Sequence, residues 1–230
     1  MVVTKHRTRL YLSVPMEPLP DFEHDVDVIT RLASRLDIAS VAIETGKTVG
    51  TDERFRSSIT RLQALGIAVL LALSHEPEED RLTEQLASVP ALGADGVHLG
   101  PLHSTENTSR KARAFLGDTA LIGVDCALSR HQAMVNGEQG ADYIAFSRSG
   151  GESMEDLKEM VNWWQTLFEL PCVACNPCNQ KELESLVQLP VDFALLPPSL
   201  WRQLAEETAF SARLIAHGLV AENPDQPPTD

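Results

Sequence analysis

The chain has 230 residues, a length that fits one large α/β domain, and its 19 Lys and Arg against 33 Asp and Glu give a formal net charge of −14. So much negative charge argues against nucleic acid as a partner, because it repels a phosphate backbone. No window approaches the roughly 18 apolar residues of a membrane span, so we expect a cytoplasmic protein with no membrane partner. The four cysteines are then expected to be reduced thiols or metal ligands before disulfides.

Short apolar runs alternate with amphipathic segments along the whole chain. In chain order the expected strands are residues 10–14, 40–44, 67–73, 93–100, 121–125, 143–146, 172–175 and 193–196. The third run is apolar on both faces, as parallel strands covered by helices are. A helix is expected after each strand, the last of them over residues 199–217. Residues 221–230 have almost nothing to bury, so we expect them to form a disordered tail behind a single domain of residues 1–220.

One motif recurs at the start of three of these strands. Gly93-Ala94-Asp95-Gly96 is repeated as Gly140-Ala141-Asp142-Tyr143, 47 residues later, and Asp192 marks a third copy after 50 more. Each copy places a small residue and an Asp at a turn and then begins a buried strand. A period near 50 holds two strand–helix units, so the chain predicts a single (β/α)8 TIM barrel. A doubly wound open sheet is the alternative, but it wants a glycine-rich turn where Pro15-Met16-Glu17-Pro18 stands.

The motif segments also carry a family resemblance. Residues 93–100, Ile122-Gly123-Val124 and residues 140–144 resemble strands four to six of the thiamine-phosphate synthase and thiazole tautomerase superfamily, and residues 9–12 resemble its first strand. The resemblance implies a barrel that joins a pyrimidine diphosphate to a thiazole phosphate, with Mg²⁺ holding the diphosphate. It also implies carboxylates for the metal and cationic side chains for the departing diphosphate.

Several rim positions depart from the family pattern. Glu44 stands where the resemblance implies an Arg, and Ala72-Leu73 stands where it implies the Asn-Asp pair that supplies a metal ligand. Pro101-Leu102-His103 replaces Gln-Glu-Asp, and Ala127 replaces the His that the tautomerase uses. The expected Mg²⁺ ligands are therefore unmatched and no other cofactor is indicated. We expect a divergent member in which the condensation is lost or impaired.

Functional residues of such barrels lie at the carboxyl ends of the strands. The candidates there for catalysis are Glu44, His98, Asp125 and Cys126, and those for binding a phosphate are Lys47, Ser147, Arg148, Asn176 and Ser199. The alternative for His98 is a structural histidine in a strand whose ring is hydrogen-bonded by a neighbouring side chain. The segment from Ser147 to Gly151 combines hydroxyl groups, a cation and permissive backbone, which suits an anion but equally suits a plain polar loop.

Cysteine usage leaves a second reading open. Cys172, Cys175 and Cys178 form a C-x₂-C-x₂-C run. Cys126, Cys175 and Cys178 would make an N/S metal site with His98 or His103 if they met at the mouth. However, Cys172 and Cys175 lie an odd number of residues apart on a strand and face opposite sides, so small apolar packing is the simpler reading.

Three functions therefore stay open. The first is a barrel that binds a small phosphorylated or heteroaromatic ligand of the thiamine-precursor type. The second is a non-catalytic binding or regulatory barrel, and the third is a thiol- or metal-dependent enzyme. The stripe of Met160, Trp163, Trp164 and Leu167 is helix core or a contact in a homo-oligomer.

Overall fold

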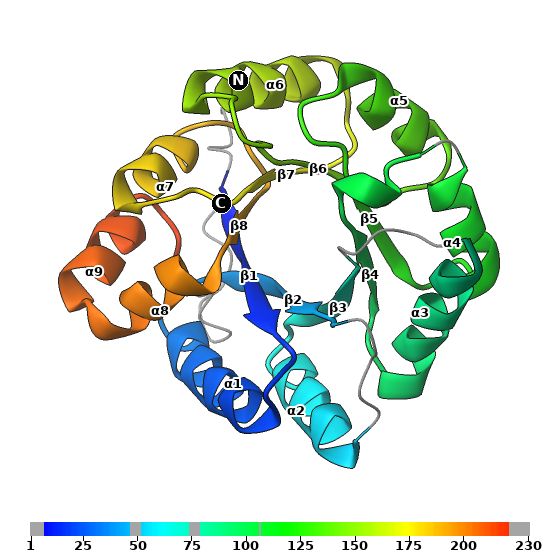
Figure 1. Ribbon diagram of the computed structural model, residues 1–230. Helices are drawn as coiled ribbons and strands as arrows, with labels where there is room; N and C mark the ends of the chain where they lie inside the picture. The colour runs from blue at the N-terminus through cyan, green and yellow to red at the C-terminus, as the bar shows by residue number, and fades with distance from the viewer. Residues whose placement is uncertain (1–6, 47–51, 74–78, 106, 221–230) are drawn as a thin grey trace, which may run out of the picture.

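The computed structural model describes residues 7–46, 52–73, 79–105 and 107–220. Eight parallel strands close into a barrel in the order β1 to β8, with β8 pairing back to β1. Figure 1 shows this ring of strands inside a ring of helices, seen from the carboxyl ends of the strands. The predicted (β/α)8 barrel is confirmed and the open sheet is excluded.

The strands fall where the apolar runs predict them. They are β1 Arg9–Pro15, β2 Ile38–Glu44, β3 Ala68–Leu73, β4 Gly96–Leu99, β5 Leu121–Asp125, β6 Tyr143–Phe146, β7 Cys172–Cys175 and β8 Phe193–Leu196. The helices are α1 Leu19–Ala33, α2 Glu53–Gln63, α3 Glu79–Leu92, α4 Thr108–Leu116, α5 Arg130–Glu138, α6 Met154–Leu167, α7 Gln180–Leu186, α8 Pro198–Glu206 and α9 Thr208–Ala216, and a 3₁₀ turn spans Pro101–His103. Within the described residues no helix is both long and apolar enough to cross a membrane.

The last segment is two helices where one was predicted. Glu207 separates α8 from α9 with extended dihedral angles, φ −97° and ψ 95°. The hydroxyl of Ser211 donates to the carbonyl of Leu204 at 2.6 Å, which satisfies an acceptor that the broken helix leaves open. The tail predicted at residues 221–230 lies outside the described residues, and the domain boundary at 220 stays a prediction.

The barrel wall separates two apolar layers. Alternate strand residues pack outward against the helices, with Leu12, Val41 and Ile144 among them. The others fill the interior; the apolar ones are Tyr11, Ala42, Leu70, Ala72, Tyr143, Ala145, Val173, Cys175 and Leu195. Because side chains alternate along a strand, each one packs either inside the barrel or against the helices.

The recurring Asp has one structural role in all three copies. The carboxylate of Asp95 accepts a hydrogen bond from the backbone N–H of Val69 on the neighbouring strand at 2.7 Å. Asp142 accepts in the same way from Ile122 at 2.7 Å, and Asp192 from Cys172 at 2.8 Å. Each Asp therefore satisfies an N–H at the start of the preceding strand, that of its first or second residue, at the amino-terminal end of the barrel.

Candidate ligand site at the barrel mouth

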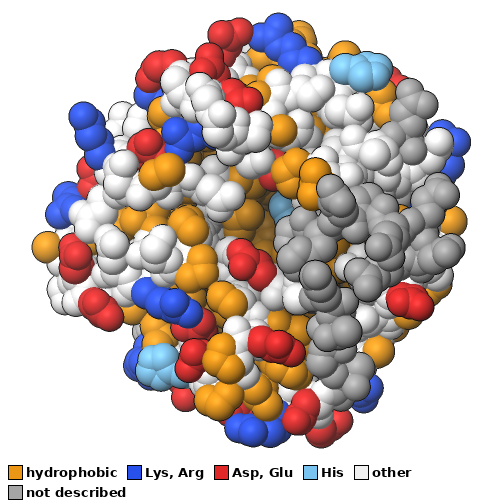
Figure 2. All heavy atoms as spheres, in the orientation of Figure 1, with side chains coloured by type: hydrophobic (Ala, Val, Ile, Leu, Met, Phe, Trp, Pro, Cys, Tyr) orange, Lys and Arg blue, Asp and Glu red, His pale blue; other side chains and the backbone are white. Residues whose placement is uncertain are grey.

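Polar side chains face the barrel axis where the strands end. Strand register puts Ser13 of β1 beside Ala42 of β2 on the inner side of the wall. On the same side, Ala72 of β3 lies between Glu44 of β2 and His98 of β4. Asp125 lies beside the inward-facing Ala145. This end of the molecule is hollowed at its centre, with apolar side chains inside the hollow and acidic ones near it (Figure 2). The sequence candidates Glu44, His98 and Asp125 thus converge on one mouth.

Glu44 ends β2 and is exposed at this mouth. Its Oε1 accepts a hydrogen bond from the hydroxyl of Ser13, which is buried on the adjacent strand. The carboxylate is thereby held at the rim on the β1–β2 side of the barrel. Ser13 was not among the sequence candidates, although its position two residues before the end of β1 is the signal that would have found it.

Asp125 is the buried acid of the mouth, with only 5% of its surface exposed. Burial raises the pKa of its carboxyl to about 6, although hydrogen bonds from Ser147 and from the backbone N–H of Ala127 oppose that rise. The bond from Ala127 is 2.9 Å long, and Ala127 adopts a positive φ of 47°. A carboxyl with a pKa near neutrality that faces a hollow is suited to proton transfer.

His98 is the upper member of a hydrogen-bonded chain inside the barrel. Its Nδ1 lies 2.8 Å from the hydroxyl oxygen of Tyr143, which lies 3.1 Å from that of Tyr11. Burial lowers the pKa of His98 to about 4, so its imidazole is neutral near neutral pH. A neighbour therefore satisfies His98, which also lies on the inner side of the wall, and its catalytic role stays a prediction.

The two tyrosines were missed by sequence reasoning, which assigned Tyr143 only to a buried strand. Gly123 is the signal that was available. A Cβ at this position would lie 1.8 Å from Cζ of Tyr143, so the glycine provides the space across which the tyrosine reaches His98. A glycine inside a strand often marks such a close approach.

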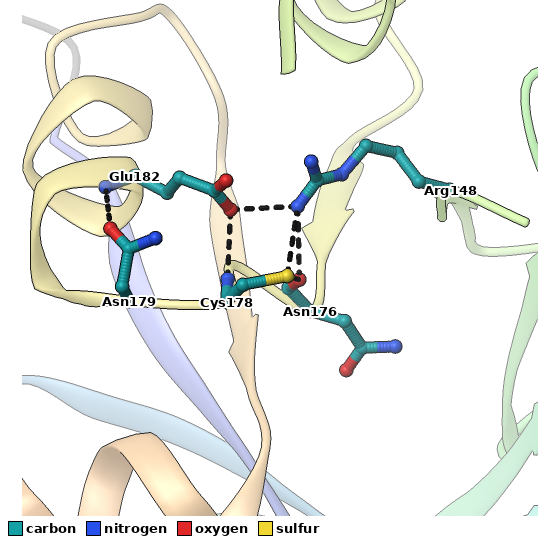
Figure 3. A network of polar contacts seen from close by, with 5 residues as sticks. All are labelled: Arg148, Asn176, Cys178, Asn179 and Glu182. Carbon is teal, nitrogen blue, oxygen red and sulfur yellow. Dashed lines mark hydrogen bonds and ion pairs between the residues drawn. The ribbon is translucent and has the colours of Figure 1, made fainter. Parts of the chain in front are cut away.

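Arg148 is held by the loop that follows β7 (Figure 3). Its Nη2 lies 2.7 Å from Oε2 of Glu182 on α7, 3.4 Å from Sγ of Cys178 and 3.5 Å from the carbonyl oxygen of Asn176. Oε2 of Glu182 also accepts from the backbone N–H of Cys178 at 2.8 Å. Burial tends to raise the pKa of Glu182, but the hydrogen bonds from Cys178 and Arg148 lower it further than burial raises it. The acid therefore stays ionised beside the cation.

The predicted phosphate ligands are only partly brought together. Arg148 and Asn176 meet, and Asn176 is exposed with a positive φ of 56°. Ser147 is buried beside Asp125, whereas Ser199 is exposed in the first turn of α8 and its hydroxyl forms no hydrogen bond with the described residues. Lys47 lies outside the described residues.

The structure does not gather the cysteines. Cys126 packs in the layer between wall and helices, Cys175 packs inside the barrel, and Cys178 is an exposed loop residue. Burial raises the pKa of Cys126 to about 12 and raises that of Cys175 well above its usual value, so neither thiol ionises readily. His103 is buried in the 3₁₀ turn. Among the described residues no three His, Cys, Asp or Glu side chains converge as they would around a metal ion.

Comparison with known proteins places this barrel in a family. The model of thiamine monophosphate synthase matches residues 82–195. A thiamine-phosphate synthase of Erythrobacter litoralis is 31% identical over 94% of this chain and 100% of its own length. The chain belongs to the thiamine-phosphate synthase family. Another family member, from Rhodospirillum centenum, is 34% identical over 89% of this chain and 94% of its own length.

Solved structures show the fold alone. A tryptophan synthase structure from Mycobacterium tuberculosis superposes with a TM-score of 0.67 at 14% identity, covering 93% of both chains. At that identity the likeness carries no information about chemistry, but it agrees with the closed barrel.

The family implies Mg²⁺, and the described mouth does not offer a site that fits it. Mg²⁺ is held by carboxylate oxygens in close octahedral geometry. Glu44 and Asp125 are the inward carboxylates at the ends of the described strands, but they belong to β2 and β5, which are not neighbours. The residues at the two rim positions where the resemblance implies metal ligands are apolar or histidine.

Proposed function

We propose that this member of the thiamine-phosphate synthase family binds a small phosphorylated or heteroaromatic compound of the thiamine-precursor type at the carboxyl end of its barrel. The observation that carries the proposal is the convergence of Glu44, His98 and Asp125 on one hollow in a barrel of this family. Family members bind a phosphorylated pyrimidine and a phosphorylated thiazole, and both are heteroaromatic rings with an anionic end.

Each part of such a ligand has a complementary group. Neutral His98 presents a hydrogen-bonding ring whose orientation is fixed by Tyr143. Asp125, with a pKa of about 6, exchanges a proton with a ring nitrogen at neutral pH at little cost. Arg148 beside Asn176 supplies the cation for a phosphate, provided that the anion competes with Glu182 for the guanidinium.

We further propose that Mg²⁺-dependent condensation is lost or impaired in this chain. The support is local, because an acid, Glu44, occupies the position of a cation. An attraction of roughly 4 kcal/mol at about 4 Å and an effective dielectric of 20 becomes a repulsion of about the same size. The names of the relatives point the other way, since those at 31% and 34% identity are called thiamine-phosphate synthase. The condensation is thus the first activity to assay.

Calorimetric titration with the thiazole phosphate and with the pyrimidine diphosphate tests binding. We expect at least one to bind saturably and Arg148→Ala to weaken it about tenfold, while Arg56→Ala, an exposed arginine of α2, leaves binding unchanged. If neither compound binds, the hypothesis of a non-catalytic binding or regulatory barrel is favoured. Product formation from both compounds with Mg²⁺, at a rate matching that of the Erythrobacter litoralis relative, would refute the impaired condensation.

The oligomeric state is a separate prediction. Leu167 of α6 is 62% exposed, whereas Trp164 is buried, so part of the predicted tryptophan stripe is core and part reaches the surface. Light scattering on the purified chain distinguishes a monomer from a homo-oligomer.

A further inference from the structure

A cavity opens at the amino-terminal end of the barrel, opposite the mouth. Its volume is about 260 Å³. The first residues of several strands line it, among them Ala68 of β3, Tyr143 of β6 and Phe193 of β8. Because the strands are parallel, their first residues meet at one end, and we call this cavity the basal pocket.

The basal pocket exists because the lowest inner layer of the barrel is underfilled. Barrel interiors of this type are packed with bulky branched side chains in successive layers. Here the neighbouring inward positions on β2 and β3 carry Ser40 and Ala68, which are paired in register. In addition, the side chain of Tyr143 reaches across Gly123 toward His98, so it lines the pocket without filling it.

The lining selects an uncharged ring. The walls are apolar and aromatic, with Tyr11, Leu70 and Phe193 facing the cavity. The charged groups at its edge are already paired, Arg9 with Asp37 at 3.0 Å and Asp142 with Arg113 at 2.7 Å. A charged ligand would therefore lose its hydration without gaining a free counter-ion.

We propose that the basal pocket binds a small neutral aromatic molecule of one or two rings. Apolar cavities of about 150 Å³ already accommodate benzene, so this pocket is large enough for a fused pair. The ligand would lie against Tyr143, whose hydroxyl orients His98. A ligand in the basal pocket therefore changes the surroundings of His98 even when no ligand is bound at the mouth.

Titration of the full chain with fluorobenzene, followed by ¹⁹F NMR, tests the site. We expect saturable binding and a change in the ring ¹⁵N signals of His98. Ala68→Leu fills the pocket and should weaken binding at least tenfold, and Ser40→Val, a milder filling, at least threefold. Ala212→Leu adds the same side chain to an exposed site on α9 and should change nothing. 4-Fluorobenzoate and 4-fluorobenzylammonium, of opposite charge, should both bind at least tenfold more weakly.

Each contrary result overturns the proposal. Absence of saturable fluorobenzene binding removes the site, and equal binding by the filled variants or unchanged His98 signals places the ring elsewhere. Binding that appears only after deletion of residues 2–6 means that the chain itself occupies the pocket, and equal binding of the charged analogues refutes the ligand class.

Discussion

The two ends of this barrel are built differently. At the amino-terminal end, Asp95, Asp142 and Asp192 bind the neighbouring strand by the same hydrogen bond. At the carboxyl end the inward side chains differ in chemistry, with Glu44 on β2, His98 on β4, Asp125 on β5 and Cys175 on β7. The base repeats because every pair of strand–helix units must satisfy the same backbone groups there, whereas the mouth is free to vary with the ligand.

The largest effect should come from adding one methyl group near the base. A Cβ on Gly96 would lie 2.0 Å from the backbone oxygen of Leu121, and backbone atoms of a paired strand cannot move aside. We expect Gly96→Ala to lower the free energy of unfolding by about 4 kcal/mol, measured by urea denaturation.

Gly137→Ala is the matched control for that change. Gly137 lies in α5, and its added Cβ would meet Leu170 at 3.4 Å, an ordinary contact. Alanine should be neutral there or stabilise the chain by about 0.5 kcal/mol. An equal loss of free energy of unfolding in both variants would contradict the claim that the backbone beside Gly96 cannot move aside.

The mouth should respond to pH through two opposed groups. Burial raises the pKa of Asp125 to about 6, so its favourable contribution is complete below pH 3.8, its unperturbed pKa, and is lost as pH rises through 6. Burial lowers the pKa of His98 to about 4, so its contribution is complete above pH 6.5 and is lost as pH falls toward 4. Each amounts to about 3 kcal/mol, and they offset one another.

Substitution separates the two groups. Relative to wild type, His98→Gln should lose about 3 kcal/mol of stability between pH 4 and pH 7, because only Asp125 then titrates. Asp125→Asn should gain about the same over that range, measured by urea denaturation at each pH. The same sign of change in both variants would refute the opposed titration.

A smaller loss is expected from the repeated Asp of the base. Asp142→Ala leaves the N–H of Ile122 without its acceptor and removes the partner of Arg113, which should cost about 2 kcal/mol. Asp95→Ala and Asp192→Ala should cost similar amounts if the three turns are equivalent. Asp118→Ala, at an exposed position with no hydrogen bond in the described structure, is the control. A loss at only one of the three would break the equivalence.

The smallest effect concerns the Arg148 network at the mouth. Glu182→Gln keeps an acceptor for the N–H of Cys178 but removes the charge beside Arg148, so stability should fall by about 1 kcal/mol. Because the guanidinium is then less neutralised, inorganic phosphate should bind several-fold more tightly. Glu159→Gln, which is largely exposed beside Arg130, should change neither quantity.

The strands of the barrel could be predicted from the sequence better than the side-chain contacts inside the barrel. Apolar runs and the recurring Asp located every strand because burial and turn chemistry are local properties of the chain. Glu44 and Asp125 were also found, since the end of a strand fixes which residues reach the rim. The chain from His98 to Tyr11 escaped because it depends on which side of the wall Tyr143 faces, and on Gly123 lying beside it in a neighbouring strand.

Long-range pairing is the other limit. Arg148 was predicted as a ligand for an anion, but Glu182, 34 residues later, pairs with it, and nothing in the local pattern of either segment joins them. Cys172, Cys175 and Cys178 were considered together because they are close in sequence, and Cys126 was added because it follows the end of a strand. Alternation along the strands then placed Cys126 and Cys175 on opposite sides of the wall.

The contact between Gly123 and Tyr143 constrains how this barrel can change. Because any β-carbon at position 123 collides with the phenol ring, the two positions cannot be substituted one at a time: the ring must shrink first or in the same step. In a combinatorial library that randomises both positions, surviving clones should fall into two groups, one retaining the glycine with the aromatic ring and one carrying a larger residue at 123 opposite a small one at 143. The second group would lack the phenol that orients the imidazole, so these two positions report which clones preserve that arrangement.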